Sequence, residues 1–398
     1  MATNVAIPSG PWDVESFKEQ GLYFHLVEVS EVLPGSARVR VTDRGEMLMF
    51  GGYSYLGLIG HPAINAAAQD AIARYGTGTN GVRLLAGTLP LHNELEASIA
   101  AFKGTEAAIA FSSGYIANIS TISSLLDRHD TVLCDKLDHA SIVDGCRLSG
   151  AKMVRFRHND LEHLAECLRA ADPRHRKLVV VDGVYSMDGD IADLPGIRAL
   201  CDEHDALLMV DEAHSLGVLG ATGRGIEEHF GLGPDTVDVK MGTFSKAIPS
   251  IGGYVAGSAK LVSDLKHKAR GFIYSAALPP ASAAASIAAL EVLRAEPERV
   301  HSLQTKFAYF LGRLKDAGFD VLGSQAAIAP VVCGSALAAT QLMMHCVRHG
   351  IFVQAILPPV VPMGLARLRA TVTSNHTIEE IDRGVEVLTS GARELGIL

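Results

Sequence analysis

The sequence has few of the features that mark secreted, metal-binding or membrane proteins. Its six cysteines form no C-x-x-C pair and no Cys/His cluster with zinc spacing, so we expect reduced, buried thiols and no metal site. The start lacks a basic segment followed by an apolar core, so we expect no secretory signal. The longest apolar stretch, around residues 276–293, is interrupted by Pro279, Pro280 and Glu291 and offers no continuous membrane span. These absences predict a cytoplasmic protein.

Positive charge is also in short supply. Among the 398 residues, acids outnumber bases 44 to 35, for a formal charge of −9, which gives no electrostatic reason to expect a nucleic-acid partner. The segment Asp211-Glu212-Ala213-His214 also occurs in nucleic-acid-dependent ATPases, but these need a G-x-x-x-x-G-K-[ST] phosphate loop, which the sequence lacks. With 48% hydrophobic and 20% charged residues, the composition is typical of an ordinary globular enzyme.

Short apolar runs alternate with helical patterns through the middle of the chain. Such alternation predicts an α/β fold with a mostly parallel central sheet sandwiched by helices. The runs are Ala108–Phe111, Thr131–Cys134, Met153–Phe156, Leu178–Val181, Ala206–Val210, Val237–Met241 and Tyr254–Ala256.

The pattern differs at both ends of the chain. Residues 1–50 read as an N-terminal arm with a hairpin-like turn at Asp43-Arg44-Gly45. After about residue 280, two helical segments, Ala281–Leu293 and Val300–Ala317, lead into short strands and helices. We therefore expect an arm at 1–50, a large domain at 51–285 and a smaller C-terminal α+β domain at 286–398.

Polar motifs follow several of the apolar runs. Ligands of open parallel sheets bind at the carboxyl ends of the strands, so these motifs are expected to share one face. Each has an ordinary alternative: Asp211 could cap a helix, Lys246 could be solvated surface, and His139 could be structural. The motifs are Phe111-Ser112-Ser113-Gly114-Tyr115, Asp138-His139-Ala140-Ser141, Tyr185-Ser186-Met187-Asp188-Gly189-Asp190, Val210-Asp211-Glu212-Ala213-His214 and Gly242-Thr243-Phe244-Ser245-Lys246.

Together the motifs match the needs of pyridoxal 5'-phosphate (PLP). Its phosphate needs N–H donors, which small residues such as Gly114 expose at a helix start. Its ring nitrogen needs a carboxylate, which Asp211 offers, and its aldehyde carbon needs a lysine, which Lys246 offers. An amine in that role must spend time unprotonated, as a partly desolvated pocket allows.

On these motifs the sequence resembles the α-oxoamine synthase family, PLP enzymes of fold type I. The resemblance covers nearly the whole chain and implies the PLP-dependent transferase fold. The further segments that carry it are Tyr53-Ser54-Tyr55-Leu56-Gly57-Leu58, Gly76-Thr77-Gly78-Thr79-Asn80-Gly81-Val82-Arg83, Phe272-Ile273-Tyr274-Ser275 and Arg367-Leu368-Arg369.

The resemblance implies roles around the PLP ring. Lys246 looks like the Schiff-base lysine and Asp211 like the partner of the ring nitrogen. His214 and Ser186 would bond the phenolic oxygen. His139 would stack on the ring and donate a hydrogen bond to the acyl thioester oxygen. Lys246, His139 and Asp211 are thus the implied catalytic residues.

The resemblance also implies a phosphate site and a shared subunit interface. Ser113, Gly114 and Tyr115, with Thr243, would hold the phosphate. Ser275 would reach the phosphate of the neighbouring subunit, so a homodimer with shared active sites is expected.

The implied reaction is a decarboxylative Claisen condensation. A small amino acid (Gly, Ala or Ser) joins an acyl group from a CoA or carrier-protein thioester, giving an α-amino ketone, a thiol and carbon dioxide. Arg369 would bind the amino-acid carboxylate. Ser54, Val360 and Leu357 depart from the family pattern, which makes the substrate entry more apolar and favours a longer acyl chain.

Two other functions share the lysine and the aspartate. One is another fold-type I reaction, such as transamination, which predicts no release of carbon dioxide. The other is a PLP-fold subunit without catalysis, although the presence of Lys246, His139 and Asp211 argues against it.

Overall fold

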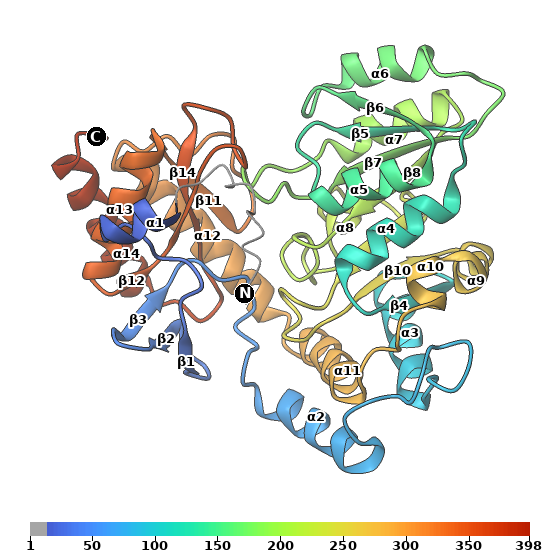
Figure 1. The fold of residues 1–398 in the computed structure, drawn as a ribbon, viewed down its shortest axis with the longest axis horizontal. Helices are drawn as coiled ribbons and strands as arrows, with labels where there is room; N and C mark the ends of the chain where they lie inside the picture. Colours follow the sequence, from blue (N-terminus) through green and yellow to red (C-terminus); the bar gives the residue numbers. More distant parts are fainter. Residues whose placement is uncertain (1–13) are drawn as a thin grey trace, which may run out of the picture.

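The computed structural model describes residues 14–398 and forms two lobes (Figure 1). The first 13 residues, which belong to the expected N-terminal arm and where we expect no secretory signal, lie outside the described residues. The larger lobe is built on a seven-stranded sheet, and the smaller lobe holds the C-terminal helices with the strands of residues 29–49.

The central sheet has the order β4-β10-β9-β8-β7-β5-β6. Five neighbouring strands, β9 to β6, run parallel, while β10 lies antiparallel to both β9 and β4. The predicted α/β fold with a mostly parallel sheet is confirmed. The strands are β4 (Ala107–Phe111), β5 (Thr131–Asp135), β6 (Lys152–Phe156), β7 (Lys177–Asp182), β8 (Leu207–Asp211), β9 (Val239–Thr243) and β10 (Gly253–Gly257).

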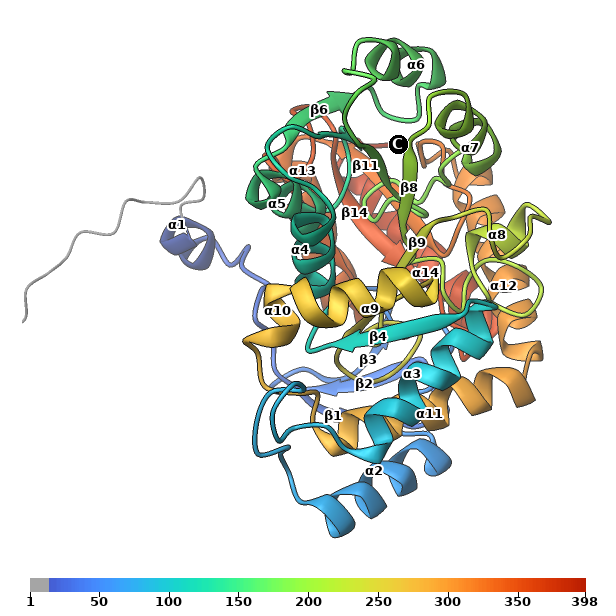
Figure 2. The ribbon, with the colours of Figure 1, turned by 90° about the vertical axis from the view of Figure 1, so that its right-hand side faces the viewer.

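Both faces of this sheet are covered, as the apolar strands predict. Alternate side chains of a strand point to opposite faces, so Val179 and Val181 pack in one core while Leu178 and Val180 pack in the other. The helices that line the second of these cores are α4 (Gly114–Leu125), α5 (Ala140–Ser149), α9 (Ala259–Lys268) and α10 (Arg270–Ile273). Figure 2 shows α9 and α10 in front of β4.

Further helices pack on the large lobe and connect it to the small lobe. The long α11 packs against α2 and α3, and α12 continues from it into the small lobe. The bounds are α2 (Pro62–Tyr75), α3 (Pro90–Lys103), α6 (Leu161–Arg169), α7 (Leu194–Glu203), α8 (Ile226–His229), α11 (Pro280–Ala295) and α12 (Glu298–Asp316).

The small lobe has its own core, which includes part of the N-terminal arm. Strands β1 (Val29–Val32), β2 (Arg38–Val41) and β3 (Gly45–Met49) form a sheet with β12 (Ile351–Phe352). A second sheet has the order β11-β14-β13, and the short α1 (Val14–Glu19) precedes both. The remaining elements are β11 (Ile328–Gly334), α13 (Ala336–Arg348), β13 (Gln354–Ile356), β14 (Ala366–Thr371) and α14 (Ile378–Glu394).

Two of the expectations from the sequence concern membrane-spanning helices and the burial of the cysteines. Within residues 14–398, no helix is long and apolar enough to cross a membrane. The six cysteines are free thiols; Cys167 and Cys333 are half-buried and the others are buried.

Candidate active site

The strand-end motifs meet at one edge of the central sheet. Strands β5, β7, β8 and β9 are parallel, so the residues that follow them emerge on the same side. The segments gathered there are Asp135–His139 after β5, Asp182–Ser186 after β7, Asp211–His214 after β8 and Thr243–Lys246 after β9.

Asp211, at the end of β8, is a buried carboxylate with a fixed orientation. Its Oδ1 accepts a hydrogen bond from the Ala213 N–H at 2.8 Å. Its Oδ2 accepts one from Asn118 Nδ2 at 2.7 Å, and the side chain of Asn118 is fully buried on α4. A carboxylate held in this way keeps its charge directed at one place, as a ring-nitrogen partner requires.

His139 caps α5 and is connected to Asp211 through two polar side chains. Its Nδ1 accepts from the Ser141 N–H at 3.3 Å and lies 2.8 Å from Ser141 Oγ. Asn118 Nδ2 donates both to this Ser141 oxygen, at 2.9 Å, and to Asp211. Because Nδ1 accepts, the ring proton of neutral His139 sits on Nε2 and is free to donate. Burial lowers the pKa of His139, which favours this neutral form.

Lys246 lies on the turn after β9 and faces His214. Its Nζ is 2.9 Å from His214 Nε2, and His214 Nδ1 is 2.7 Å from the hydroxyl of Tyr55. Burial lowers the pKa of Lys246 to about 8 and holds the pKa of His214 well below its usual range. An amine with this pKa is partly unprotonated near neutral pH, which is the state that attacks an aldehyde.

The start of α4 forms a concave backbone next to β9 and β10. Ser113 is its N-cap, and the Ser113 hydroxyl oxygen accepts from the Ile116 N–H at 3.1 Å. A Cβ on Gly253 would lie 2.6 Å from the Cα of Gly114, so only glycine fits there. Thr243 Oγ1 lies 2.9 Å from Ser245 Oγ and donates to the Gly252 carbonyl at 2.9 Å. This cradle of hydroxyls and a helix N-terminus fits a phosphate group.

Arg369, from β14 of the small lobe, completes this group. Its Nε donates to the Ser186 carbonyl at 2.6 Å, and its guanidinium carbon lies 4.7 Å from the centre of the Tyr53 ring. The Lys246 Nζ lies 5.9 Å from the same ring. Within the described chain, Arg369 Nη2 is buried without a hydrogen-bond partner. An unpaired guanidinium N–H beside the lysine fits the carboxylate of an amino acid.

The other predicted residues lie at the margins of this group. Ser54 Oγ is buried without a hydrogen-bond partner among residues 14–398, and Val360 is exposed. Ser275 follows α10, next to the bridge that Val82 forms with Ala276. Tyr115 is exposed and donates to Asp144.

Sequence reasoning missed several residues that the structure brings into this group. Asn118 belongs to none of the predicted motifs, although it lies one helical turn beyond Gly114 and donates to Asp211. Tyr53 and Tyr55 were quoted as part of a motif without a role. Asp182, which accepts a hydrogen bond from the His139 N–H at 3.0 Å, directly follows the apolar run Leu178–Val181 and belongs to none of the predicted motifs.

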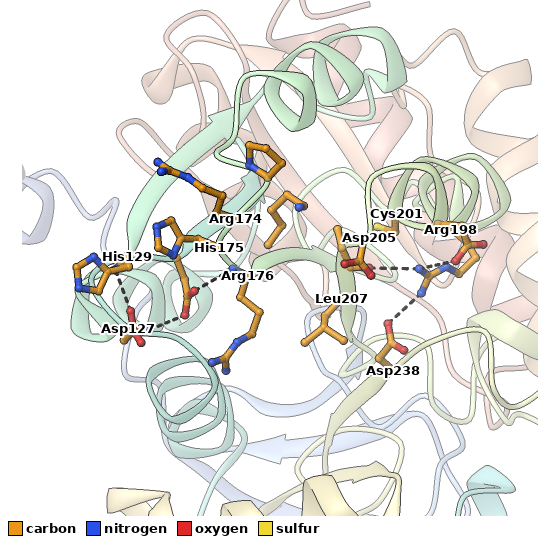
Figure 3. A pocket seen from close by; sticks show the side chains of 15 residues that line it. Asp127, His129, Arg174, His175, Arg176, Arg198, Cys201, Asp205, Leu207 and Asp238 are labelled. Carbon is orange, nitrogen blue, oxygen red and sulfur yellow. Dashed lines mark hydrogen bonds and ion pairs between the residues drawn. The ribbon is translucent and has the colours of Figure 1, made fainter.

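A large polar cavity lies at the opposite edge of the sheet. It has a volume of about 780 Å³ and is lined by residues at the amino-terminal ends of the same strands, including His129, His175, Leu207 and Asp238 (Figure 3). Since ligands of such sheets bind beyond the carboxyl ends of the strands, this cavity is separate from the site.

Comparisons with known proteins match nearly the whole chain to one group of enzymes. The family model "Aminotransferase class I and II" matches residues 46–388. An 8-amino-7-oxononanoate synthase from Geobacter sulfurreducens is 44% identical, covering 97% of this chain and 98% of the relative. The chain belongs to the α-oxoamine synthases, PLP-dependent enzymes within this family. The resemblance stated from the sequence is thereby confirmed, as are the cofactor and the class of enzyme.

Further relatives of this synthase support the same assignment. A serine palmitoyltransferase from Sphingobacterium spiritivorum is 42% identical, covering 94% of this chain and 92% of the relative. A solved serine palmitoyltransferase from S. paucimobilis with bound PLP–myriocin is 32% identical, covers 97% of both chains and superposes with a TM-score of 0.93. The fold-type I architecture is therefore shown by structure as well as by sequence.

Proposed function

We propose that this synthase joins a small amino acid (Gly, Ala or Ser) to an acyl thioester at the edge of the sheet where Lys246 lies. One observation carries the proposal: the Lys246 amine and the unpaired Nη2 of Arg369 flank the Tyr53 ring. This pairs a site for the amino group with a site for the carboxylate of one substrate. The products are an α-amino ketone, a thiol and carbon dioxide.

When bound, PLP supplies an electron sink that stabilises negative charge on the α-carbon of the amino acid. Asp211, oriented by Asn118, maintains the positive charge of the ring nitrogen on which that sink depends. Lys246 anchors the cofactor and then, with its pKa lowered to about 8, removes and returns a proton at the α-carbon.

Other residues of the site are proposed to bind the thioester oxygen, the phenolic oxygen and the phosphate. His139 would lie against the bound cofactor, and its Nε2–H would donate a hydrogen bond to the oxygen of the acyl thioester as charge develops there. His214 and Ser186 hold the phenolic oxygen. Ser113, Gly114, Tyr115 and Thr243 hold the phosphate, because a helix N-terminus with hydroxyl donors favours an anion.

Residues at the margin of the site decide which acyl donor and which amino acid bind. We propose that Ser54 and Val360 contact the substrates, with the acyl group carried by CoA or a carrier protein. The relatives named 8-amino-7-oxononanoate synthase and serine palmitoyltransferase differ little in identity to this chain, at 44% and 42%. The acyl thioesters used by both groups of relatives therefore have to be tested.

The active unit is proposed to be a homodimer. Large apolar side chains are exposed on neighbouring segments of the large lobe: Leu85 is 84% exposed, Tyr274 73% and Ile251 53%. Covering such a patch by a second copy removes it from water, and it places Ser275 at the subunit boundary. We infer that the dimer acts in the cytoplasm, with a large PLP-binding domain at 51–285 and a small domain at 286–398.

The test supplies the purified PLP-loaded protein with Gly, Ala or Ser and with acyl-CoA thioesters of increasing length. We expect one amino acid to shift the visible absorbance of the cofactor, and one pair to release free thiol and carbon dioxide in equal amounts. Formation of the pyridoxamine form without carbon dioxide would instead indicate transamination. No thiol release with any pair, on CoA or on a carrier protein, would refute the synthase reaction.

A further inference from the structure

His158, which follows β6, holds its ring between two carboxylates. Its Nδ1 lies 3.0 Å from Asp135 Oδ1, and its Nε2 lies 2.9 Å from Asp190 Oδ2. Carboxylates accept hydrogen bonds, so both ring nitrogens donate and His158 is an imidazolium. Burial lowers the pKa of His158, but the hydrogen bonds to Asp135 and Asp190 outweigh it and raise the pKa to about 10. The ring also packs edge-on against Tyr185, with centres 4.4 Å apart.

This group resembles a metal site in composition but not in bonding. The ligand atoms of His158, Asp188 and Asp190 lie within 4.8 Å of one another. However, both nitrogens of His158 donate protons to carboxylates, and Asp188 pairs with Arg367. A metal needs an imidazole lone pair, so the arrangement is that of a cation shared between acids.

One end of the network holds the loop that carries His139. Asp135, fully buried, ends β5, and its carboxylate accepts from the Leu137 N–H at 2.8 Å and the Asn159 N–H at 2.9 Å as well as from His158. Three donors therefore fix the start of the loop 136–139. Its end is fixed by Asp182, which accepts from the His139 N–H at 3.0 Å.

The other end holds the loop that carries Ser186. The Asp190 carbonyl accepts from the Tyr185 N–H at 3.0 Å, and Asp190 Oδ2 accepts from Asn159 Nδ2 at 2.9 Å. Arg369 is bonded to the tip of this loop through the Ser186 carbonyl. Displacement of Asp190 is therefore transmitted to the arginine proposed to bind the substrate carboxylate.

We propose that His158 is a positioning residue of this enzyme: shared between Asp135 and Asp190, it sets the spacing between the loop of His139 and the loop bonded to Arg369. The inference rests on the proposed roles of His139 and Arg369. His139 lies on one of these loops and Arg369, on β14, is bonded to the other, so the spacing of the loops decides whether the reacting groups align. A misplacement of about 1 Å from a change remote from the chemistry can cost about 100-fold in rate.

The test replaces His158 by Phe, which keeps a ring against Tyr185 and removes both N–H donors. The holoenzyme is measured for kcat, for KM of both substrates, for visible circular dichroism of bound PLP and for Tm. We expect kcat to fall at least tenfold and the dichroism of bound PLP to change, with a smaller change in KM for the thioester. The matched control is His345→Phe, since buried His345 also has both nitrogens beside polar partners, Ser390 and Glu394, but in the small-lobe core.

The outcomes separate positioning from simple destabilisation. If kcat of His158→Phe falls less than tenfold, or if His345→Phe loses kcat and Tm to the same extent, the proposal is overturned. If His158→Phe does not fold, the same measurements are made on Asp190→Asn. This change removes the negative charge beside His158 Nε2 and keeps an oxygen that can accept its hydrogen bond. A fall in kcat of at least threefold supports the proposal and a smaller one overturns it. Should the wild type make no product at all, the proposed function fails, while the dichroism of bound PLP still reports whether His158 positions the site.

Discussion

At the residue scale, the site depends on side chains whose charge and orientation are set by neighbours. Lys246 is exposed enough to meet a ligand, yet burial lowers its pKa to about 8. Asp211 receives hydrogen bonds from Asn118 and Ala213, so its orientation does not depend on the cofactor. A weakly basic amine and a fixed carboxylate are both prepared before PLP binds.

The lowered pKa of Lys246 predicts a pH-dependent uptake of PLP. The neutral amine is the reactive form, so the fraction available rises with pH through about 8 rather than through the ordinary lysine range. We expect the rate at which the apoprotein develops its visible absorbance to increase from pH 7 to 9 with a midpoint near 8. Lys246→Ala should abolish trapping of PLP by borohydride, and the exposed Lys260→Ala should leave it intact. A midpoint near 10 would contradict the assigned environment.

Asn118 is predicted to matter for catalysis although it lies outside the predicted motifs. Asn118→Ala removes a buried hydrogen bond to a charged group, which is worth about 1.5–3 kcal/mol, and also releases Ser141 and His139. We expect kcat/KM to fall about 10- to 150-fold, as 1.4 kcal/mol corresponds to tenfold. Steady-state kinetics against Ser123→Ala, a part-buried serine on the same helix, provides the check. Equal kcat/KM of the Asn118→Ala and Ser123→Ala variants would contradict a role for Asn118 in the site.

At the element scale, the polar motifs work because they end parallel strands. The strands β5, β7, β8 and β9 deliver their carboxyl-terminal residues to one edge, and β10, running antiparallel, brings glycines back against α4. Gly253 approaches Gly114 so closely that a Cβ would lie 2.6 Å from its Cα. The cradle proposed for the phosphate is therefore a contact between two elements.

Gly253→Ala is expected to damage this cradle. The neighbouring atoms belong to backbone, so the methyl group forces β10 and α4 apart, at a cost of about 1–3 kcal/mol. We expect weaker PLP affinity and a lower Tm, measured by cofactor titration and thermal unfolding. Gly312→Ala is the control, because a Cβ there meets no atom within 4 Å and alanine favours helix. Unchanged PLP affinity in Gly253→Ala would mean that the phosphate lies elsewhere.

At the scale of the whole molecule, the two lobes meet through the site. Arg369 comes from β14 and bonds to the Ser186 loop of the large lobe, and Arg367 bonds to Met187 and Asp188 there. Leu357, predicted to make the substrate entry more apolar, instead packs inside the small-lobe core. Of these two apolar residues, only Val360 is exposed and able to line an entry.

The shared cation at His158 predicts how the stability of the folded protein varies with pH. Its folded pKa of about 10 exceeds the ordinary value of 6.5, so its stabilisation is complete below pH 6.5 and is lost as pH rises toward 10. We expect the Tm difference between wild type and His158→Phe to be largest near pH 6 and to vanish near pH 10. Thermal unfolding across this range tests the assignment, and a difference that grows with pH would contradict it.

The exposed apolar side chains Leu85, Tyr274 and Ile251 predict that two copies of the chain form a dimer. Leu85→Asp places a charge among exposed apolar side chains and should convert a dimer into a monomer, because a buried unpaired charge opposes association. Sedimentation velocity distinguishes the two states, and Leu148→Asp, an exposed leucine on α5, is the control. If Leu85→Asp sediments as the wild type does, the interface lies elsewhere.

The sequence by itself determined the fold class and predicted which residues gather at the site. Apolar strands that alternate with helices allow one main architecture, a covered parallel sheet, and its strand ends fixed where Lys246, Asp211 and His139 would meet. The tertiary structure alone decided the contributions of Asn118, Tyr55 and His158, and the bond from Arg369 to the Ser186 loop. Single polar residues on helices, and contacts between segments more than 90 residues apart, leave no periodic pattern, so only packing shows what they touch.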